Sequence, residues 1–165
     1  MKKYLILLLL FNVFLLNAQE DPKSTIQGNN ELKINMAYAI AGFPEITYER
    51  ILDDGGSVGL SVAFSVEEDI DYNVLAVPFY RLYFGEKRAA GFFIEANVAL
   101  FSEDKDDGST DSALGFGPGL AVGGKFLTRS GWVAEILGGA GRNFLNENEI
   151  SGVFPRLGVS IGKRF

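Results

Sequence analysis

In this chain of 165 residues, the first candidates for chemistry are charged residues within segments where apolar residues alternate with small or polar ones. Eight of them fall on the face of their segments that otherwise carries small residues: Lys33, Glu45, Glu49, Glu95, Lys125, Glu135, Arg156 and Arg164. Four are acids and four are bases, and a confined interior tolerates charges only when they are paired. These eight residues therefore predict a network of ion pairs that closes the interior into which they point.

Histidine and cysteine are both absent from the sequence. Histidine is the usual general base at neutral pH, and cysteine supplies disulfides and thiolate metal ligands. We therefore expect a protein that is not an enzyme and binds no cofactor. Serine or aspartate nucleophiles activated by lysine or by carboxylates stay open as an alternative.

The segment from Gly119 to Lys125 matches the glycine and lysine spacing of a phosphate-binding loop. Phe126 stands where that motif requires Ser or Thr, and the surrounding alternation predicts a strand instead of the helix whose N-terminus would hold a phosphate. We therefore interpret these glycines as residues that face the inside of a barrel.

The acidic segment 103–111 has the composition of a calcium-binding loop. Aligning Gly108 with the sixth position of an EF-hand loop puts Lys105 at the third position and Leu114 at the twelfth, where oxygen ligands are required. The motif fails, and a solvated acidic loop is the preferred interpretation. An irregular divalent-cation site shared with the acidic residues of 67–71 stays open as an alternative.

The elements that must position these residues are strands, because apolar residues alternate with small or polar ones throughout the domain. We expect eight of them: Leu32 to Ala41, Glu45 to Leu52, Ser57 to Val66, Val74 to Phe84, Phe92 to Phe101, Leu114 to Phe126, Trp132 to Phe144 and Gly152 to Phe165. The strand from Val74 to Phe84 is apolar on both faces, so its facing, and that of Arg81, is left open. Pro78 suggests a bulge there.

The bulky side chains belong to one face of these strands and the small ones to the other, the reverse of what a soluble barrel needs. Short and long polar connections also alternate, as they do in membrane barrels. The fold expected is therefore all-β, an eight-stranded antiparallel up-and-down transmembrane β-barrel.

Outward aromatic residues are expected at both rims of this barrel. Four fall at the periplasmic ends of their strands if both termini are periplasmic, and form a membrane girdle: Phe92, Phe126, Trp132 and Phe165. Four others are expected near the opposite rim: Phe43, Tyr72, Phe101 and Phe144.

The N-terminal segment has the pattern of a secretory signal peptide, with Lys2 and Lys3 before an apolar run and Ala18 at the expected cleavage site. Residues 1–18 are thus the signal peptide, 19–30 a flexible periplasmic lead-in, and 31–165 the barrel. Removing the two lysines leaves 13 basic and 21 acidic residues, a charge of −8. Nucleic acid is not an expected partner.

The segment "GVSIGKRF" resembles the C-terminal signature of outer-membrane barrels, an alternating strand that ends in an aromatic residue. The stretches "AVPFYRLYFGE", "GFFIEANVAL", "FGPGLAVGGKF" and "GWVAEILGGAGRNF" resemble small, uncharacterised outer-membrane β-barrels of Gram-negative bacteria that carry a domain of unknown function. The resemblance covers nearly all of 31–165 and implies fold and location, with the C-terminal strand engaging the barrel-assembly machinery.

Two functions follow from this pattern. We expect a structural or surface-interaction barrel of the outer membrane, whose external loops contact lipopolysaccharide, lipid or a surface partner and whose lumen is closed by paired charges. The alternative is a soluble, periplasmic, lipocalin-like barrel with a hydrophobic ligand inside. The small, charged inner face disfavours that alternative, because such a cavity is lined by apolar and aromatic groups.

Overall fold

The computed structural model describes residues 28–53, 55–67, 70–105 and 111–165. The predicted signal peptide and the lead-in up to residue 27 lie outside the described residues. The described chain forms one closed antiparallel barrel in which each strand pairs with its neighbours in sequence and β1 pairs with β8. The elements are β1 (Asn30–Asn35), α2 (Met36–Ile40), β2 (Glu45–Ile51), β3 (Gly56–Phe64), β4 (Tyr72–Tyr83), β5 (Gly91–Asp104), β6 (Ser112–Leu127), β7 (Trp132–Arg142) and β8 (Val153–Arg164).

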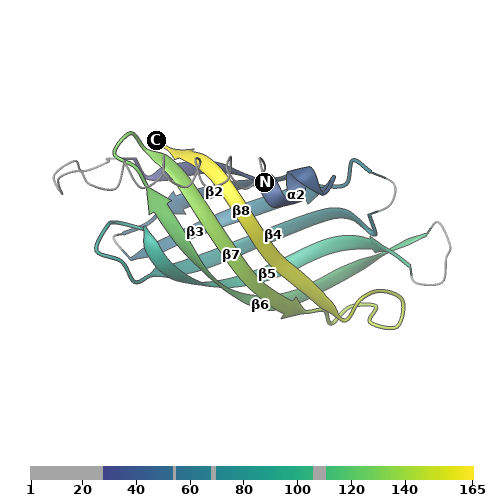
Figure 1. The fold of residues 1–165 in the computed structure, drawn as a ribbon. Helices are drawn as coiled ribbons and strands as arrows, with labels where there is room; N and C mark the ends of the chain where they lie inside the picture. The colour runs from purple at the N-terminus through teal and green to yellow at the C-terminus, as the bar shows by residue number, and fades with distance from the viewer. Residues whose placement is uncertain (1–27, 54, 68–69, 106–110) are drawn as a thin grey trace, which may run out of the picture.

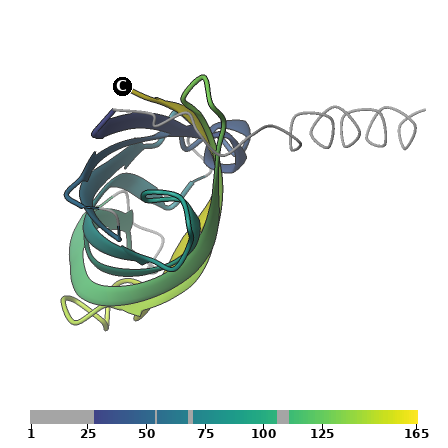
Figure 2. The same cartoon turned by 90° about the vertical axis from the view of Figure 1, so that its left-hand side faces the viewer.

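The two ends of the barrel differ (Figure 1). At the end where β8 reaches the C-terminus, here called the terminal end, short turns join β2 to β3 and β6 to β7, and a longer connection, residues 84–90, joins β4 to β5. At the opposite end, the loop end, lie α2 and the connections β3–β4, β5–β6 and β7–β8. Figure 2, which looks along the barrel, shows the strands closing into a ring. The expected eight-stranded antiparallel barrel is thus present.

The first strand is shorter than expected, because β1 ends at Asn35 and the chain turns into the helix α2. The Asn35 side chain accepts a hydrogen bond from the Tyr38 backbone N–H and so caps the helix. It also donates to the Leu157 carbonyl (3.0 Å) and accepts from the Val159 N–H (3.2 Å), in the place of a further backbone pair with β8. The prediction of a strand through Ala41 is therefore wrong.

The structure decides the facing of β4, which the sequence left open. Leu75, Val77 and Arg81 point inward with Phe79 and Tyr83, while the residues between them face outward. Pro78 lies opposite Leu60 without shifting the register, and the irregularity falls between Tyr72 and Val74. The bulge suggested at Pro78 is therefore absent, and the irregularity of β4 lies near its loop end instead.

The inner face is more aromatic than expected, because four rings lie inside the barrel beside glycines. Each ring is paired across neighbouring strands with a glycine: Phe79 with Gly59, Phe101 with Gly115, Phe93 with Gly123 and Phe154 with Gly141. A Cβ added to these glycines would lie between 2.0 and 2.4 Å from the ring. The glycines therefore make room for inward rings, which explains why residues that weaken a strand recur here.

Candidate functional site: an ion-paired lumen

All eight charged residues predicted to face inward are buried, with at most 6 % of each residue exposed. Glu31 and Arg81 join them and are also buried. We call this set the lumen network: Glu31, Lys33, Glu45, Glu49, Arg81, Glu95, Lys125, Glu135, Arg156 and Arg164. It holds five carboxylates and five cations, so its formal charges cancel (5 − 5 = 0). Every strand of the barrel except β3 contributes a charged member.

Glu49 on β2 is the centre of the network. Its Oε2 accepts from Lys33 Nζ at 2.6 Å and from Arg81 Nη1 at 2.9 Å. Its Oε1 accepts from Lys125 Nζ at 2.8 Å. The hydroxyls of Ser57 and Tyr83 donate to the same Oε1, each at 2.6 Å. Five donors surround one carboxylate, which offsets the large cost of moving its charge out of water.

Arg81 on β4 connects three carboxylates. Its Nη1 donates to Glu135 at 2.8 Å as well as to Glu49, and its Nε donates to Glu95 at 2.8 Å. The guanidinium also lies 4.4 Å from the ring centroids of both Phe79 and Phe93. A planar, delocalised cation suits this position, because it can stack between two rings and still donate at its edges.

The network extends toward the loop end through Arg156 on β8. Its Nε donates to Glu95 at 2.9 Å, its Nη1 donates to Glu45 at 2.9 Å, and its Nη2 donates to the Ser61 hydroxyl at 3.0 Å. Ser61 is also within hydrogen-bond distance of Thr47, at 2.8 Å. Strands β2, β3, β5 and β8 are thereby joined across the lumen.

The network ends at the terminal end in a pair between β1 and β8. Glu31 accepts from Arg164 Nη2 at 2.6 Å and from Lys125 Nζ at 2.8 Å. Arg164 also donates to the backbone carbonyls of Arg88 and Ala89, at 2.9 and 2.8 Å. The β4–β5 turn is therefore held across the terminal end of the barrel by a charge-assisted contact.

Apolar side chains fill the lumen toward the loop end and also lie among the members of the network near the terminal end. At the loop end, nine buried residues pack together, with Tyr38, Ile70 and Tyr72 partly buried against them: Phe43, Ala63, Leu75, Val77, Ala99, Phe101, Ala113, Ile150 and Phe154. Burial, with Glu45 nearby, raises the pKa of the Tyr38 phenol above its usual range. At the terminal end, Ile51, Tyr83 and Phe93 form a second cluster with Ala89, Ala121 and Leu137.

The sequence analysis did not place Glu31 and Arg81 inside the barrel, although a sequence feature of each indicates that it faces inward. Glu31 is two residues before Lys33 and therefore shares its face of the strand. Arg81 is the charged residue in the middle of an otherwise apolar strand, and its cross-strand partner is Glu95. A rule that places every mid-strand charge inside the barrel would have found it.

The four predicted girdle residues are all exposed and lie at the terminal end: Phe92 (51 %), Phe126 (71 %), Trp132 (53 %) and Phe165 (61 %). The four aromatic residues expected to face outward at the opposite rim differ in their exposure. Phe144 is exposed, whereas Phe43 and Phe101 are buried in the loop-end cluster and Tyr72 packs against it. Phe101 faces inward because it is six residues from Glu95 and therefore in the same phase.

The outer face is apolar on all eight strands. Its outward positions include Leu32, Tyr48, Leu60, Tyr80, Ile94, Val122, Ile136 and Val159, one from each strand. Outward charges on the described strands lie only near strand ends, at Arg50, Asp104, Arg142 and Lys163. Most charged residues of the strands thus lie on the inner face, and the outer face is apolar.

Arginines and lysines hold the carboxylates of the lumen network in short hydrogen bonds, so these carboxylates act as structural partners of buried basic side chains. Among the described residues, no group of three or more Asp, Glu, His or Cys side chains is arranged to hold a metal ion. Residues 106–110, with Glu68 and Asp69, on which the alternative cation site depends, lie outside the described residues.

Fold and interior together define a class: a closed, eight-stranded antiparallel β-barrel whose lumen holds a network of buried ion pairs. Comparisons of the chain with protein-family models, curated proteins and solved structures gave no match. No helix within the described ranges is both long and apolar enough to cross a membrane.

Proposed function

We propose that this protein is a non-enzymatic β-barrel of the outer membrane, with a structural or surface-interaction role carried by its loop end. The observation that carries the proposal is the apolar outer face, which encircles the barrel on all eight strands. Soluble monomers rarely expose a contiguous apolar patch larger than a few hundred Å². Lipid tails are the environment in which such a face costs no free energy.

The residues at the borders of this face support the proposal. The aromatic girdle at the terminal end suits a membrane–water interface, where one side of a ring is apolar and the other is wet. Lys163 Nζ lies 5.2 Å from the Trp132 ring and donates to the Ser130 carbonyl, so its stem runs along the apolar face while its charge reaches the polar turn. Lipid or lipopolysaccharide is therefore the first partner that we assign to the outer face.

The lumen network supports a closed barrel instead of a channel. Its ion pairs span the interior, the loop-end cluster fills the lumen beside it, and the terminal-end cluster packs among its members. The same filled interior disfavours the soluble alternative, in which a hydrophobic ligand would need that space. The loop end is then the part of the molecule left to contact a partner.

Cell fractionation tests the location, and planar bilayers test the closed lumen. We expect the protein to sediment with outer membranes, to need detergent for release, and to migrate differently on a gel before and after boiling. In bilayers we expect no stable single-channel steps. Release without detergent would instead favour the soluble barrel, and large reproducible steps would contradict the closed lumen.

A further inference from the structure

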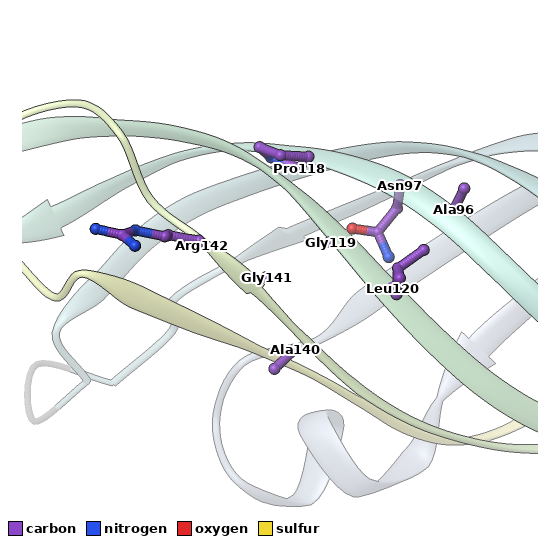
Figure 3. A pocket seen from close by; sticks show the side chains of 8 residues that line it. All are labelled: Ala96, Asn97, Pro118, Gly119, Leu120, Ala140, Gly141 and Arg142. Atoms are coloured by element: carbon purple, nitrogen blue, oxygen red, sulfur yellow. The ribbon is translucent and has the colours of Figure 1, made fainter.

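The outer face departs from a uniform wall of bulky apolar residues in two places. One is a hollow between β5, β6 and β7, lined by small residues such as Ala96, Gly119 and Ala140 (Figure 3). Asn97 beside it is in phase with Glu95 and donates to that carboxylate, so its amide belongs to the lumen. The other place is the terminal end of the outer face, where β7, β8, β1 and β2 lie side by side.

Two cations lie on the outer face at this terminal end. Arg50 on β2 and Lys163 on β8 are both exposed, and β1 lies between their strands. At ~4.8 Å per strand, their backbones are about 10 Å apart across the sheet. Arg50 pairs with Asn30 and Lys163 with Leu32, so the two cations are one outward position apart along the strands. Both side chains therefore border the same small area of the wall.

Neutral groups hold both cations in place. Arg50 Nη1 donates to the Asn30 side-chain oxygen at 2.8 Å, and the Tyr48 hydroxyl donates to the same oxygen at 2.8 Å. Lys163 Nζ is held by the turn carbonyl and the tryptophan ring described above. Within the described residues, neither cation forms an ion pair with a carboxylate, and each has N–H groups left to donate.

The lack of a carboxylate partner distinguishes these two cations from other basic side chains of the strands. Each of the five cations of the lumen network forms at least one ion pair. At the loop end of the outer face, Arg142 lies 3.9 Å from Glu147, and Asp104 is an outward acid of the same end. The strands thus carry an uncompensated positive charge on their outer face at the terminal end, although the whole chain has a charge of −6.

Apolar side chains continue from the two cations toward the middle of the wall. Leu32 on β1 is the cross-strand partner of Lys163, and the next outward row holds Ile46, Ile34 and Ile161 on β2, β1 and β8. All four apolar side chains are exposed. A cationic border that passes directly into an exposed apolar surface matches a molecule with a charged head and an apolar chain.

We propose that this terminal patch, formed by Arg50, Lys163, Leu32 and Ile34, binds one anionic phospholipid. The lipid phosphate accepts hydrogen bonds from Arg50, whose planar guanidinium can donate to two phosphate oxygens at once. Lys163 supplies a second positive charge beside it, and an acyl chain lies along Leu32 and Ile34. The inference rests on the proposed membrane location and names the class of lipid that the outer face prefers.

The charges of the outer face favour a lipid over a second copy of the chain. Two copies inserted in the same orientation place their terminal ends at the same depth in the membrane. The outward charges of the described strands at that depth are the cations Arg50 and Lys163, so a neighbouring copy brings like charge to the patch. A lipid phosphate brings the opposite charge at the depth where the apolar face ends.

Native mass spectrometry of the full chain in a neutral detergent, with three lipids of equal chain length, tests the proposal. Phosphatidylglycerol is anionic, whereas phosphatidylethanolamine and phosphatidylcholine are zwitterionic. We expect one molecule of phosphatidylglycerol to be retained about tenfold better than either zwitterionic lipid, because two cations face its net negative charge.

Matched variants locate the bound lipid. Arg50→Gln should lower retention of phosphatidylglycerol about tenfold, and Lys163→Gln about fivefold. Asn30→Ala keeps both charges but removes the acceptor that orients Arg50, and should lower retention about threefold. Arg142→Gln removes an outward arginine at the loop end and should leave retention unchanged. Because these side chains are exposed or at the rim, gel migration before boiling should show each variant to be folded.

Equal retention of the three lipids would overturn the proposal, and so would equal effects of Arg50→Gln and Arg142→Gln. A dimer that dissociates on Arg50→Gln would overturn it in favour of a second copy as the occupant. Fractionation separates the two proposals: a membrane-embedded protein that does not prefer phosphatidylglycerol refutes the terminal patch alone, whereas release without detergent refutes the membrane location itself.

Discussion

Replacing Arg81 by methionine tests whether the lumen network stabilises the barrel. The substitution keeps a long apolar stem between the rings of Phe79 and Phe93 and removes the guanidinium. Three carboxylates lose a donor, namely Glu49, Glu95 and Glu135, and the network changes from neutral to a charge of −1. Because removing one partner of a buried ion pair costs ~3–5 kcal/mol, we expect the free energy of unfolding to fall by that amount.

Urea unfolding in detergent micelles or vesicles measures this change, with the fluorescence of Trp132, the single tryptophan, as the signal. The midpoint should fall while the slope stays constant. Lys105→Met is the control, because its ion pair with Glu149 (3.1 Å) is partly exposed. Exposed pairs contribute about 0–1 kcal/mol, so the control should unfold almost as the unchanged protein does.

A double variant shows whether charge balance is the cause. Arg81→Met with Glu95→Gln restores neutrality, and the glutamine oxygen still accepts from Arg156. The double variant should therefore be more stable than the sum of the single effects predicts, by at least ~1 kcal/mol. A loss below about 1 kcal/mol for Arg81→Met, or strictly additive losses in the double variant, would refute this account of the lumen.

Three further predictions concern the wall of the barrel. Gly123→Val should cost ~1–3 kcal/mol in urea unfolding, because its Cβ would lie 2.4 Å from both the Phe93 ring and the Ile136 carbonyl oxygen. Gly124→Val, with Ile136 Cγ2 4.0 Å away, should stay within ~0.5 kcal/mol. Equal costs for the two substitutions would contradict the close packing at Gly123. Leu60→Arg should cost ~2–4 kcal/mol in vesicles and Val66→Arg, beyond the end of β3, only ~0–1; two equally tolerated arginines would argue against a lipid-facing belt. Asn35→Ala should destabilise the barrel by ~0.5–2 kcal/mol and speed hydrogen exchange at the Val159 amide, which Asn35 Oδ1 accepts from; unchanged exchange there would show that Asn35 does not end β1.

Local alternation was informative wherever the two faces of a strand differ in size or polarity. In β2 the inward Glu45, Thr47 and Glu49 alternate with the outward Ile46 and Tyr48, so period two was enough to place each of them. The same rule failed on β4, where apolar residues occupy both faces. There the pairing of Arg81 with Glu95 on the neighbouring strand decides which way the strand faces.

The prediction of a strand where helix α2 forms was wrong for a different reason. The segment from Met36 to Ile40 continues the alternation of β1, and nothing in its composition prevents a strand. Its conformation depends on Asn35, whose side chain reaches β8, more than one hundred residues away in sequence. The cap itself is local, but hydrogen bonds to so distant a strand cannot be read from a local pattern.

The sequence by itself determined the eight alternating segments, the separation of charged from bulky apolar faces and the positions of the turns. These features depend on period two and on turn residues, which are local. Only the tertiary structure decided which charges meet, that rings such as Phe93 and Phe101 fill the lumen, and that the wall is hollowed beside Gly119. Each of these depends on the register between strands, and register is set by the packing of the closed barrel as a whole.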